Sequence, residues 1–197
     1  KTEVHIHQAS LDPDYQQDRQ NMLVLADKVH DFWVKGFLEQ SVHHMALHDL
    51  QMQGRDDLIA GPFERTVAFP DKPAKVIGED ESIVEVFNEA HRALLVLGAP
   101  GSGKTIALLE LTRDLLEGVR ENHLQKIPVV LTLSTWQEHH KDLKEWVVEQ
   151  INKHYKIPTP DVRRWVQKNR LILLLDGLDE VNEKYRKTCA QAINEFR

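Results

Sequence analysis

The sequence predicts an α/β fold in which a doubly wound parallel sheet, incomplete at its C-terminal end, follows an N-terminal helical extension. Short continuous apolar runs occur at residues 93–97 (ALLVL), 129–133 (VVLTL) and 171–175 (LILLL). Such runs are typical of parallel strands that are buried on both faces. The segments between them repeat apolar residues at the three- and four-residue spacing of helices. This alternation of strand and helix predicts a sheet with helices on both faces.

The beginning of the chain follows a different pattern. Residues 1–16 are polar and show no sustained period, which predicts a tail or linker. An amphipathic helix is predicted from residue 19 to about residue 40, because apolar residues recur along one helical face. That face consists of Met22, Ala26, Val29, Trp33 and Phe37.

A second helix is predicted over residues 43–53, whereas residues 54–78 contain three prolines and predict an irregular connection. The change in pattern that follows indicates the start of the α/β part. The predicted division of the chain is a tail over residues 1–17, a helical extension over 18–70 and an α/β domain over 71–197.

The helices of the α/β part are predicted from their apolar faces. These faces are Ile83, Val86, Phe87 and Ala90; Leu108, Leu111, Leu115 and Val119; Leu143, Trp146, Val147 and Ile151; Val162, Trp165 and Val166; and Tyr185, Cys189, Ala192, Ile193 and Phe196. Ser82 is a candidate cap for the first of them. Trp33, Trp136, Trp146 and Trp165 are assigned to the core, because large aromatic side chains dominate core packing.

The composition excludes several classes of function. Lys and Arg number 25 and Asp and Glu 31, so the net charge is −6 and no basic excess points to nucleic acid. No run approaches the roughly 20 apolar residues of a membrane-spanning helix, and the N-terminus lacks the apolar core of a signal peptide. We expect a cytoplasmic protein with no nucleic-acid or membrane partner.

The histidines and the single cysteine form no recognisable metal-binding or disulfide motif in the sequence. His44 and His48 would share one helical face, but the sequence places no third metal ligand beside them. We interpret them as part of a solvated surface, together with His5, His7, His139 and His140. Cys189 occupies an apolar position of the last helix, which predicts a buried thiol and no disulfide.

Residues 98–105 (GAPGSGKT) match the pattern of a phosphate-binding loop between a strand and a helix. In that position, successive backbone N–H groups and the N-terminus of the helix point at one anion. We expect Lys104 to reach the β- and γ-phosphates and the Thr105 hydroxyl to bind Mg²⁺. The nucleotide-binding residues are then Gly98, Ala99, Pro100, Gly101, Ser102, Gly103, Lys104 and Thr105.

A second site follows the run LILLL. Asp176 comes directly after it, and an acid at the carboxyl end of a parallel strand faces the crevice where ligands bind. We expect Asp176 to hold Mg²⁺, through water, opposite Thr105. Asp179 and Glu180 lie one short turn further on, where they would orient or deprotonate the water that attacks the γ-phosphate. The alternative is that the pair only caps the next helix.

The remaining motifs narrow the nucleotide to ATP or ADP. A GTPase normally carries Asn-Lys-x-Asp, and the sequence Asn152-Lys153-His154-Tyr155 breaks that pattern. The Leu-Ser-Gly-Gly-Gln sequence of ABC-type ATPases does not occur in the chain. Guanine specificity therefore has no support.

At residues 173–181 (LLLDGLDEV) the sequence resembles the NACHT family of STAND ATPases. Residues 94–116, 127–136 and 189–197 are similar to successive blocks of bacterial NACHT modules, and residues 30–43 are similar to the helix that often precedes them. The resemblance extends over most of the chain from about Asp18.

The resemblance implies a slowly hydrolysing, regulated ATPase. In this family ADP holds a closed monomer, exchange for ATP opens it, and opened protomers self-associate and activate an attached effector. Lys104, Thr105 and Asp176 match the family's phosphate and magnesium positions, and Asp179 with Glu180 matches its acidic pair.

The resemblance also carries expectations about adenine and about the rest of the protein. Val76 and Ile77 precede Gly78 where many members hold adenine, although Glu79 replaces the usual Arg. The family continues with a sensor strand, a helical domain and a winged-helix domain. We expect these, together with the effector and sensor domains, to lie outside this chain, which begins with Lys1 rather than Met.

Two other functions compete with this one. A P-loop kinase would need an acceptor pocket and a mobile basic lid, and residues 120–170 contain no Arg-rich lid segment. A module that binds nucleotide without turnover is the third possibility.

The strand order separates these classes. In the class that NACHT proteins resemble, a sensor strand lies between the strands that carry the two motifs. Residues 94–97 and 171–175 should then run parallel with an unfilled lane between them, and residues 129–133 should pair with 171–175. The exposed edges of such a gap predict poor stability of the fragment. Direct pairing of the two motif strands would instead favour the kinase and GTPase class.

Overall fold

The computed structural model describes residues 13–41, 65–68, 75–77, 82–97, 103–122, 126–140 and 142–196. The predicted helix at 43–53, with His44 and His48, lies outside these residues, as do His5 and His7 and residues 98–102 of the glycine-rich loop.

The N-terminal segment is one long helix. Helix α1 (Pro13–Val29) continues directly into a π-helical segment, η1 (His30–Leu38). Proline suits the first turn of a helix, because its fixed φ is already helical and that turn does not need its missing N–H. The expected tail therefore ends earlier than predicted, since residues 13–16 are helical.

The π-helical hydrogen bonds change which residues of this helix face the core. Val34 and Leu38 are 2% and 3% exposed, whereas Phe37 is 47% exposed and Trp33 is half-buried. A π-helix bonds residue i to i+5, so it takes more residues per turn than an α-helix. The buried face consequently moves from the predicted position 33 to 34 and from 37 to 38. The prediction that Phe37 belongs to the buried face was wrong.

Three strands form a small antiparallel sheet in the order β2-β1-β3. β1 (Arg65–Ala68) pairs with β2 (Lys75–Ile77) on one side and with β3 (Leu95–Leu97) on the other. The interpretation of residues 54–78 as an irregular connection was therefore wrong at β1 and β2. Proline cannot donate to a strand ladder, and all three prolines of that segment fall outside both strands.

A second, parallel sheet consists of β4 (Ile127–Thr132) and β5 (Leu171–Asp176). Its register runs from Ile127 opposite Leu171 to Thr132 opposite Asp176, which confirms the predicted pairing of these two runs. Among the described strands no ladder joins β3 to β5, so the two motif strands do not pair directly. The described strands thus form two sheets, and the lane between β3 and β5 and the doubly wound arrangement stay predictions.

The first motif strand is less enclosed than predicted. Leu95 of β3 is 53% exposed, whereas the run was expected to be buried on both faces. The reason lies in its partners, because β3 pairs only with the short strand β1 among the described strands and has no parallel neighbour there.

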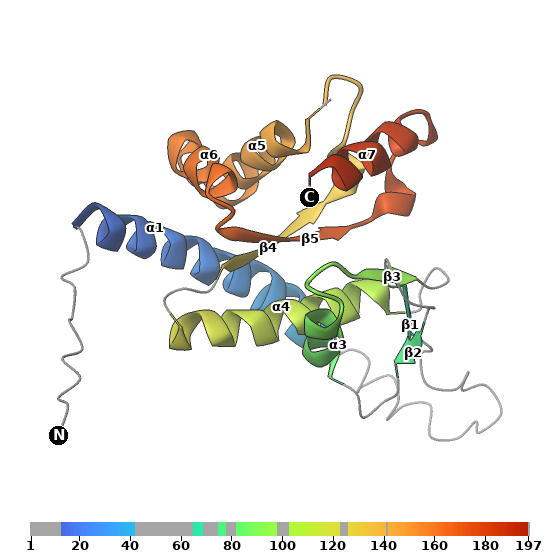
Figure 1. Cartoon of the computed structure of the whole chain (residues 1–197), viewed down its shortest axis with the longest axis horizontal. Helices are drawn as coiled ribbons and strands as arrows, with labels where there is room; N and C mark the ends of the chain where they lie inside the picture. The colour runs from blue at the N-terminus through green and yellow to red at the C-terminus, as the bar shows by residue number, and fades with distance from the viewer. Residues whose placement is uncertain are drawn as a thin grey trace, which may run out of the picture.

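The helices surround the β4–β5 pair in two layers (Figure 1). On one face lie α5, α6 and α7, and on the other lies α4, with the short helix α3 next to it. Their bounds are α3 Ile83–Glu89, α4 Lys104–Glu121, α5 Leu143–Tyr155, α6 Thr159–Gln167 and α7 Glu183–Glu195, and two 3-10 turns, η2 Leu133–Thr135 and η3 Leu178–Glu180, follow the strands. The predicted helices of the α/β part are thereby confirmed.

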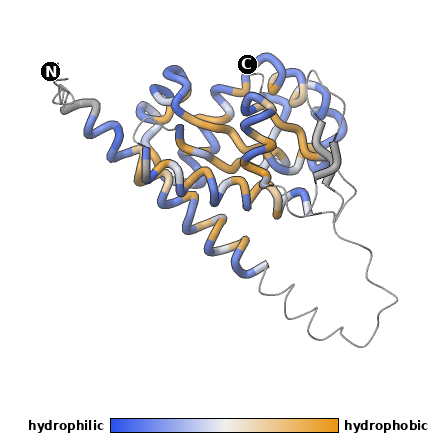
Figure 2. Tube along the Cα trace, turned by 60° about the horizontal axis from the view of Figure 1, so that its bottom comes forward, coloured by the Kyte–Doolittle hydropathy of each residue, from blue (hydrophilic) through white to orange (hydrophobic). Residues whose placement is uncertain are grey.

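The core lies between the two layers, where the apolar segments of the chain gather along the strands and the inner helix faces (Figure 2). Trp136, Trp146 and Trp165 are fully buried, as predicted. Cys189 is also buried, and this burial raises the pKa of its thiol to about 11. The thiol therefore stays protonated and unreactive at neutral pH.

Helix α1 is attached to both layers by buried polar contacts. Arg19 donates from Nη2 to the carbonyl oxygen of Val119 in α4 at 2.9 Å. On the other side Asp18 Oδ1 accepts from Trp165 Nε1 at 2.7 Å and from Arg164 Nη2 at 2.6 Å. The helical extension is thus part of the same packed unit as the α/β core.

We expect Asp18→Asn to lower the free energy of unfolding by about 1–2 kcal/mol, because it removes a charge-assisted bond and disturbs the Trp165 bond. Partial exposure of Arg164 keeps the loss moderate. Asp27→Asn is the matched control. Asp27 lies on the same helix, but its ion pair with Arg120 is exposed on both sides and longer, at 3.5 Å. Urea unfolding of the three proteins measures the difference, and equal loss in both variants would contradict this anchoring role.

The contacts of Asp18 with Trp165 and Arg164 also predict how the stability of the protein depends on pH. Burial raises the pKa of Asp18, but hydrogen bonds from Trp165 and Arg164 and the charges of Arg164 and Lys168 outweigh it, so the net pKa lies below the ordinary value. The stabilisation is then complete above about pH 4, the unfolded pKa, and is lost as the pH falls through the lower folded pKa. Unfolding curves of the parent and Asp18→Asn should converge over that range.

Candidate functional site

The end of the glycine-rich loop forms the N-terminus of helix α4. Gly103 has φ 78° and ψ 18°, in the left-handed region, and Lys104 is the first residue of the helix. Glycine reaches this conformation without a steric penalty. The carbonyl oxygen of Gly103 accepts from the Ala107 N–H at 2.9 Å, so the helix begins with a regular turn. Because residues 98–102 lie outside the described part, the phosphate cradle itself stays a prediction.

The structure brings Thr105 and Asp176 into direct contact, although they are 71 residues apart. Thr105 Oγ1 donates to Asp176 Oδ2 at 3.0 Å. Thr105 lies in the first turn of α4 and Asp176 is the last residue of β5, and both are half-buried. The two predicted motifs therefore meet at one point.

This oxygen pair fits a hard divalent cation. Mg²⁺ binds oxygen ligands and usually keeps several of its waters. A hydroxyl and a carboxylate that share a hydrogen bond of 3.0 Å suit such an ion, because Thr105 could bind it directly and Asp176 could bind one of its waters. The sequence predicts that Asp176 lies opposite Thr105 across the metal site. In the structure the two side chains instead lie next to each other.

The acidic pair lies in a turn of its own. Gly177 has φ 78°, and the 3-10 turn η3 that follows it contains Asp179 and Glu180, both exposed. The cap of helix α7 is a different residue, because Asn182 Oδ1 accepts from the Lys184 N–H at 3.0 Å. Neither Asp179 nor Glu180 is therefore the side-chain cap of α7.

Sequence reasoning missed the residue that supports this turn. Arg186 of α7 donates from Nη2 to the carbonyl oxygens of Asp179 at 2.9 Å and Val181 at 3.1 Å. These bonds attach the backbone of the acidic turn to the following helix. The only signal in the sequence was an arginine one turn into that helix, which by itself suggests solvent exposure.

The predicted adenine contacts Val76 and Ile77 lie in β2. This strand is separated from β3 by β1 alone, so both residues belong to the same sheet as the strand that leads into the glycine-rich loop. Their contact with adenine stays a prediction.

One histidine prediction was wrong. His139 is exposed as expected, but His140 is buried, and its Nδ1 accepts from the Gln137 N–H at 2.9 Å. Nε2 must then carry the proton that bridges to Glu149 at 3.2 Å. His139, His140 and Glu149 have ligand atoms within 4.8 Å of one another, but both nitrogens of His140 already hold the loop to α5. Glu149 is nine residues away, and only the packing of α5 brings it close.

A glycine-capped helix whose first turn contacts the aspartate at the end of a parallel strand is the site of a P-loop NTPase. The sequence model of the NACHT domain family matches residues 92–195, more than half of the chain, and the chain belongs to this family. It is accordingly a nucleotide-binding and NTP-hydrolysing module of the kind found in signalling proteins. Comparisons with curated proteins and with solved structures give no match. Within the described residues, no helix combines the length and apolar character needed to cross a membrane.

We expect Gly177→Ala to destabilise the acidic turn by about 1–2 kcal/mol, because a residue with a Cβ is strained at positive φ. The new Cβ would also lie 3.0 Å from Glu180 Oε2 and displace that carboxylate. Thermal unfolding measures the loss. Adding Glu180→Ala removes the contact but not the backbone strain, so full recovery of stability in the double variant would show that the strain argument is wrong.

Proposed function

We propose that this protein binds ATP with Mg²⁺, hydrolyses it slowly, and uses the state of the nucleotide to control self-association and effector activation. The observation that carries the proposal is the contact between Thr105 and Asp176, since it brings together the predicted phosphate and metal motifs. Family membership supports nucleotide binding and hydrolysis in general, and the specific choice of ATP rests on the missing guanine motif.

The phosphate end of ATP would bind at the N-terminus of α4. Residues 98–103 would surround the phosphates with backbone N–H groups, and the Lys104 ammonium would add a charge-assisted contact to the β- and γ-phosphates. Thr105 would hold Mg²⁺ directly and Asp176 would hold it through water. The bound ion would supply positive charge against the phosphate oxygens. Val76 and Ile77 are the proposed adenine contacts.

Asp179 and Glu180 are proposed to act on the attacking water. They lie one short turn beyond Asp176, and both side chains are exposed to solvent in η3. Arg186 fixes the backbone of this turn, which limits the positions that the carboxylates sample. A carboxylate in such a place accepts a proton from water or orients it for in-line attack.

The strand pairing supports a switch ATPase over a kinase. β4 lies directly beside β5, and no ladder joins β3 to β5 among the described strands. That is the pattern expected when another strand separates the two motifs. A kinase of the runner-up class would instead pair the motif strands directly.

Control of assembly is proposed from the family. ADP would favour a closed monomer and ATP an open form that self-associates through the NTPase module. Slow hydrolysis then acts as a timer, because the active state lasts until the γ-phosphate is lost. The effector and sensor domains would lie outside this chain, in a cytoplasmic protein.

Lys104→Ala should weaken ATP binding roughly tenfold to a hundredfold, because it removes a charge-assisted contact of about 1.5–3 kcal/mol. Titration calorimetry with Mg·ATP measures the change. Lys187→Ala is the control, since Lys187 is exposed on α7. Unchanged affinity of Lys104→Ala would refute the proposed phosphate site.

Asp179→Asn combined with Glu180→Gln should leave ATP affinity nearly unchanged and abolish turnover, because these groups act on the water rather than on the bound phosphates. The measurement is release of inorganic phosphate, with and without candidate phosphoryl acceptors. Hydrolysis at the parental rate would remove the pair from the mechanism, and phosphate transfer to an acceptor would favour the kinase.

A further inference from the structure

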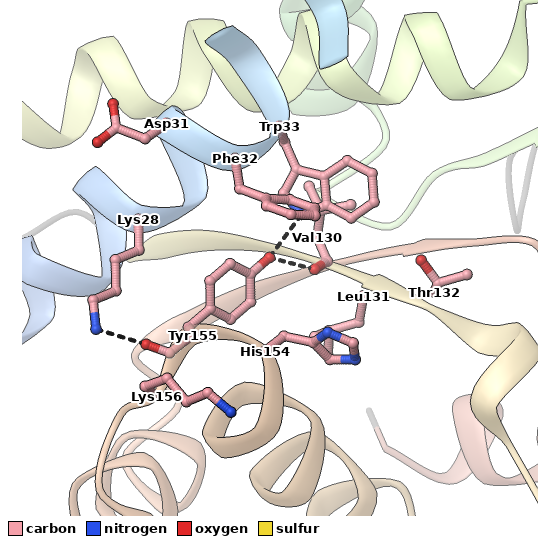
Figure 3. Close-up of a pocket in the computed structure, with 10 residues that line it drawn as sticks. All are labelled: Lys28, Asp31, Phe32, Trp33, Val130, Leu131, Thr132, His154, Tyr155 and Lys156. Atoms are coloured by element: carbon pink, nitrogen blue, oxygen red, sulfur yellow. Dashed lines mark hydrogen bonds between the residues drawn. The ribbon is translucent and has the colours of Figure 1, made fainter. Parts of the chain in front are cut away.

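A cavity of about 470 Å³ lies between η1, β4 and the end of α5 (Figure 3). Phe32 and Trp33 enter it from the N-terminal helix, Tyr155 and Lys156 enter it from α5, and Thr132 lies at the end of β4. None of the proposed nucleotide-site residues lines this cavity, although Thr132 is paired with Asp176 in the β4–β5 register.

A chain of hydrogen bonds makes the floor of the cavity rigid. Trp33 Nε1 donates to Tyr155 Oη at 2.8 Å, and Tyr155 Oη donates to the carbonyl oxygen of Val130 at 2.7 Å. Burial raises the pKa of Tyr155 far above its ordinary value, so the phenol keeps its proton at neutral pH. This part of the cavity is therefore preorganised, which reduces the side-chain entropy that the protein would lose when a ligand binds there.

The upper wall of the cavity is aromatic and open to solvent. Phe32 is 62% exposed and stands edge-on to Trp33, with ring centroids 5.1 Å apart and an interplanar angle of 80°. The π-helical register places Val34 and Leu38 in the core and leaves Phe32 and Trp33 over the cavity. π-helical geometry occurs frequently at functional sites, and here the segment presents two aromatic side chains to the cavity.

The rim of the cavity is positively charged. Lys28 Nζ donates to the carbonyl oxygen of Tyr155 at 2.7 Å, and Lys156 follows directly after α5 with no carboxylate partner in the described part of the chain. Burial and then the charges of Lys153 and Lys156 lower the pKa of His154, which leaves this histidine neutral. Among the described residues that line the cavity, Asp31 is the only one with a carboxylate; it is paired with Lys35 at 2.9 Å and points away from the other lining side chains.

We propose that this cavity binds a small organic anion with a flat apolar body, such as an aromatic carboxylate or sulfonate. The ring would stack against Phe32, and the anionic group would lie near Lys156 and Lys28. The volume falls within the range of about 300–1,000 Å³ that is usual for small-molecule sites. Because the walls come from both the N-terminal helix and α5, the ligand would join the helical extension to the α/β core.

The probe for this site is 8-anilinonaphthalene-1-sulfonate, and N-phenyl-1-naphthylamine supplies the same ring system without the anionic group. We expect saturable fluorescence with one sulfonate probe per chain and weaker binding of the neutral probe. Lys156→Asn and Phe32→Ala should each weaken the sulfonate probe roughly threefold to tenfold. Asparagine tolerates the left-handed conformation that Lys156 adopts at φ 54°, and Phe32 is exposed, so both variants should fold.

The matched controls are Lys144→Gln and Val24→Ala. Lys144 is an exposed lysine near the start of α5, and Val24 is an exposed apolar residue on the N-terminal helix, but neither lines the cavity. Probe affinity should be unchanged in both. Equal weakening in controls and test variants, or equal affinity for the neutral probe, would overturn the proposal.

Two further measurements separate this site from its alternatives. Mg·ATP should not displace the sulfonate probe, because the nucleotide binds elsewhere; displacement would place the probe in the nucleotide site and refute the proposal. Probe binding per chain should also be independent of protein concentration. A decrease at high concentration would show that a second copy covers the cavity, and the surface would then be an interface rather than a ligand site.

Discussion

The hydrogen bond between Thr105 and Asp176 joins the first turn of α4 to the carboxyl end of β5. Each partner is held by regular structure: α4 begins at a left-handed glycine, and β5 is fixed by its parallel ladder with β4. The position of Asp176 in turn places Gly177 and the acidic turn η3, whose backbone Arg186 holds from α7. If this contact were lost, the proposed phosphate, metal and water-activating groups would no longer share one site.

The N-terminal helix contributes to the same unit from outside the family match. It is attached through Asp18 to α6, through Arg19 to α4, and through Lys28 to the end of α5. The Arg19 contact is buried and the other two are partly buried, so the helix is attached by polar groups whose removal leaves unsatisfied partners. A signal that moves this helix would therefore reach both layers around β4 and β5, which is a physical route between an extension and an NTPase core.

The cavity beside β4 and the nucleotide site use different properties of the fold. The nucleotide site lies at a helix N-terminus and a strand end, where backbone N–H groups and carboxylates favour phosphate and metal. The cavity lies where the π-helical register exposes aromatic rings beside a helix C-terminus rich in lysine. Two chemically distinct surfaces thus share the strand pair, and they adjoin where Thr132 is paired with Asp176.

The sequence by itself determined the features that arise from local chemistry. Apolar period and continuous runs identified β4, β5 and the helices of the α/β part, and the glycine, lysine and acidic motifs predicted that Thr105 and Asp176 converge. These predictions work because helix periodicity and the glycine requirement act over a few residues.

Only the tertiary structure decided the rest. The strands β1 and β2 are four and three residues long, too short to show a period, and they form through pairing with each other and with β3. The burial of Leu38 instead of Phe37 depends on a π-helical register that packing against α4 stabilises. His140 became buried through a partner on another element, Glu149. In each case the deciding contact joins residues on different elements of the fold, and no local pattern encodes the free energy of such a contact.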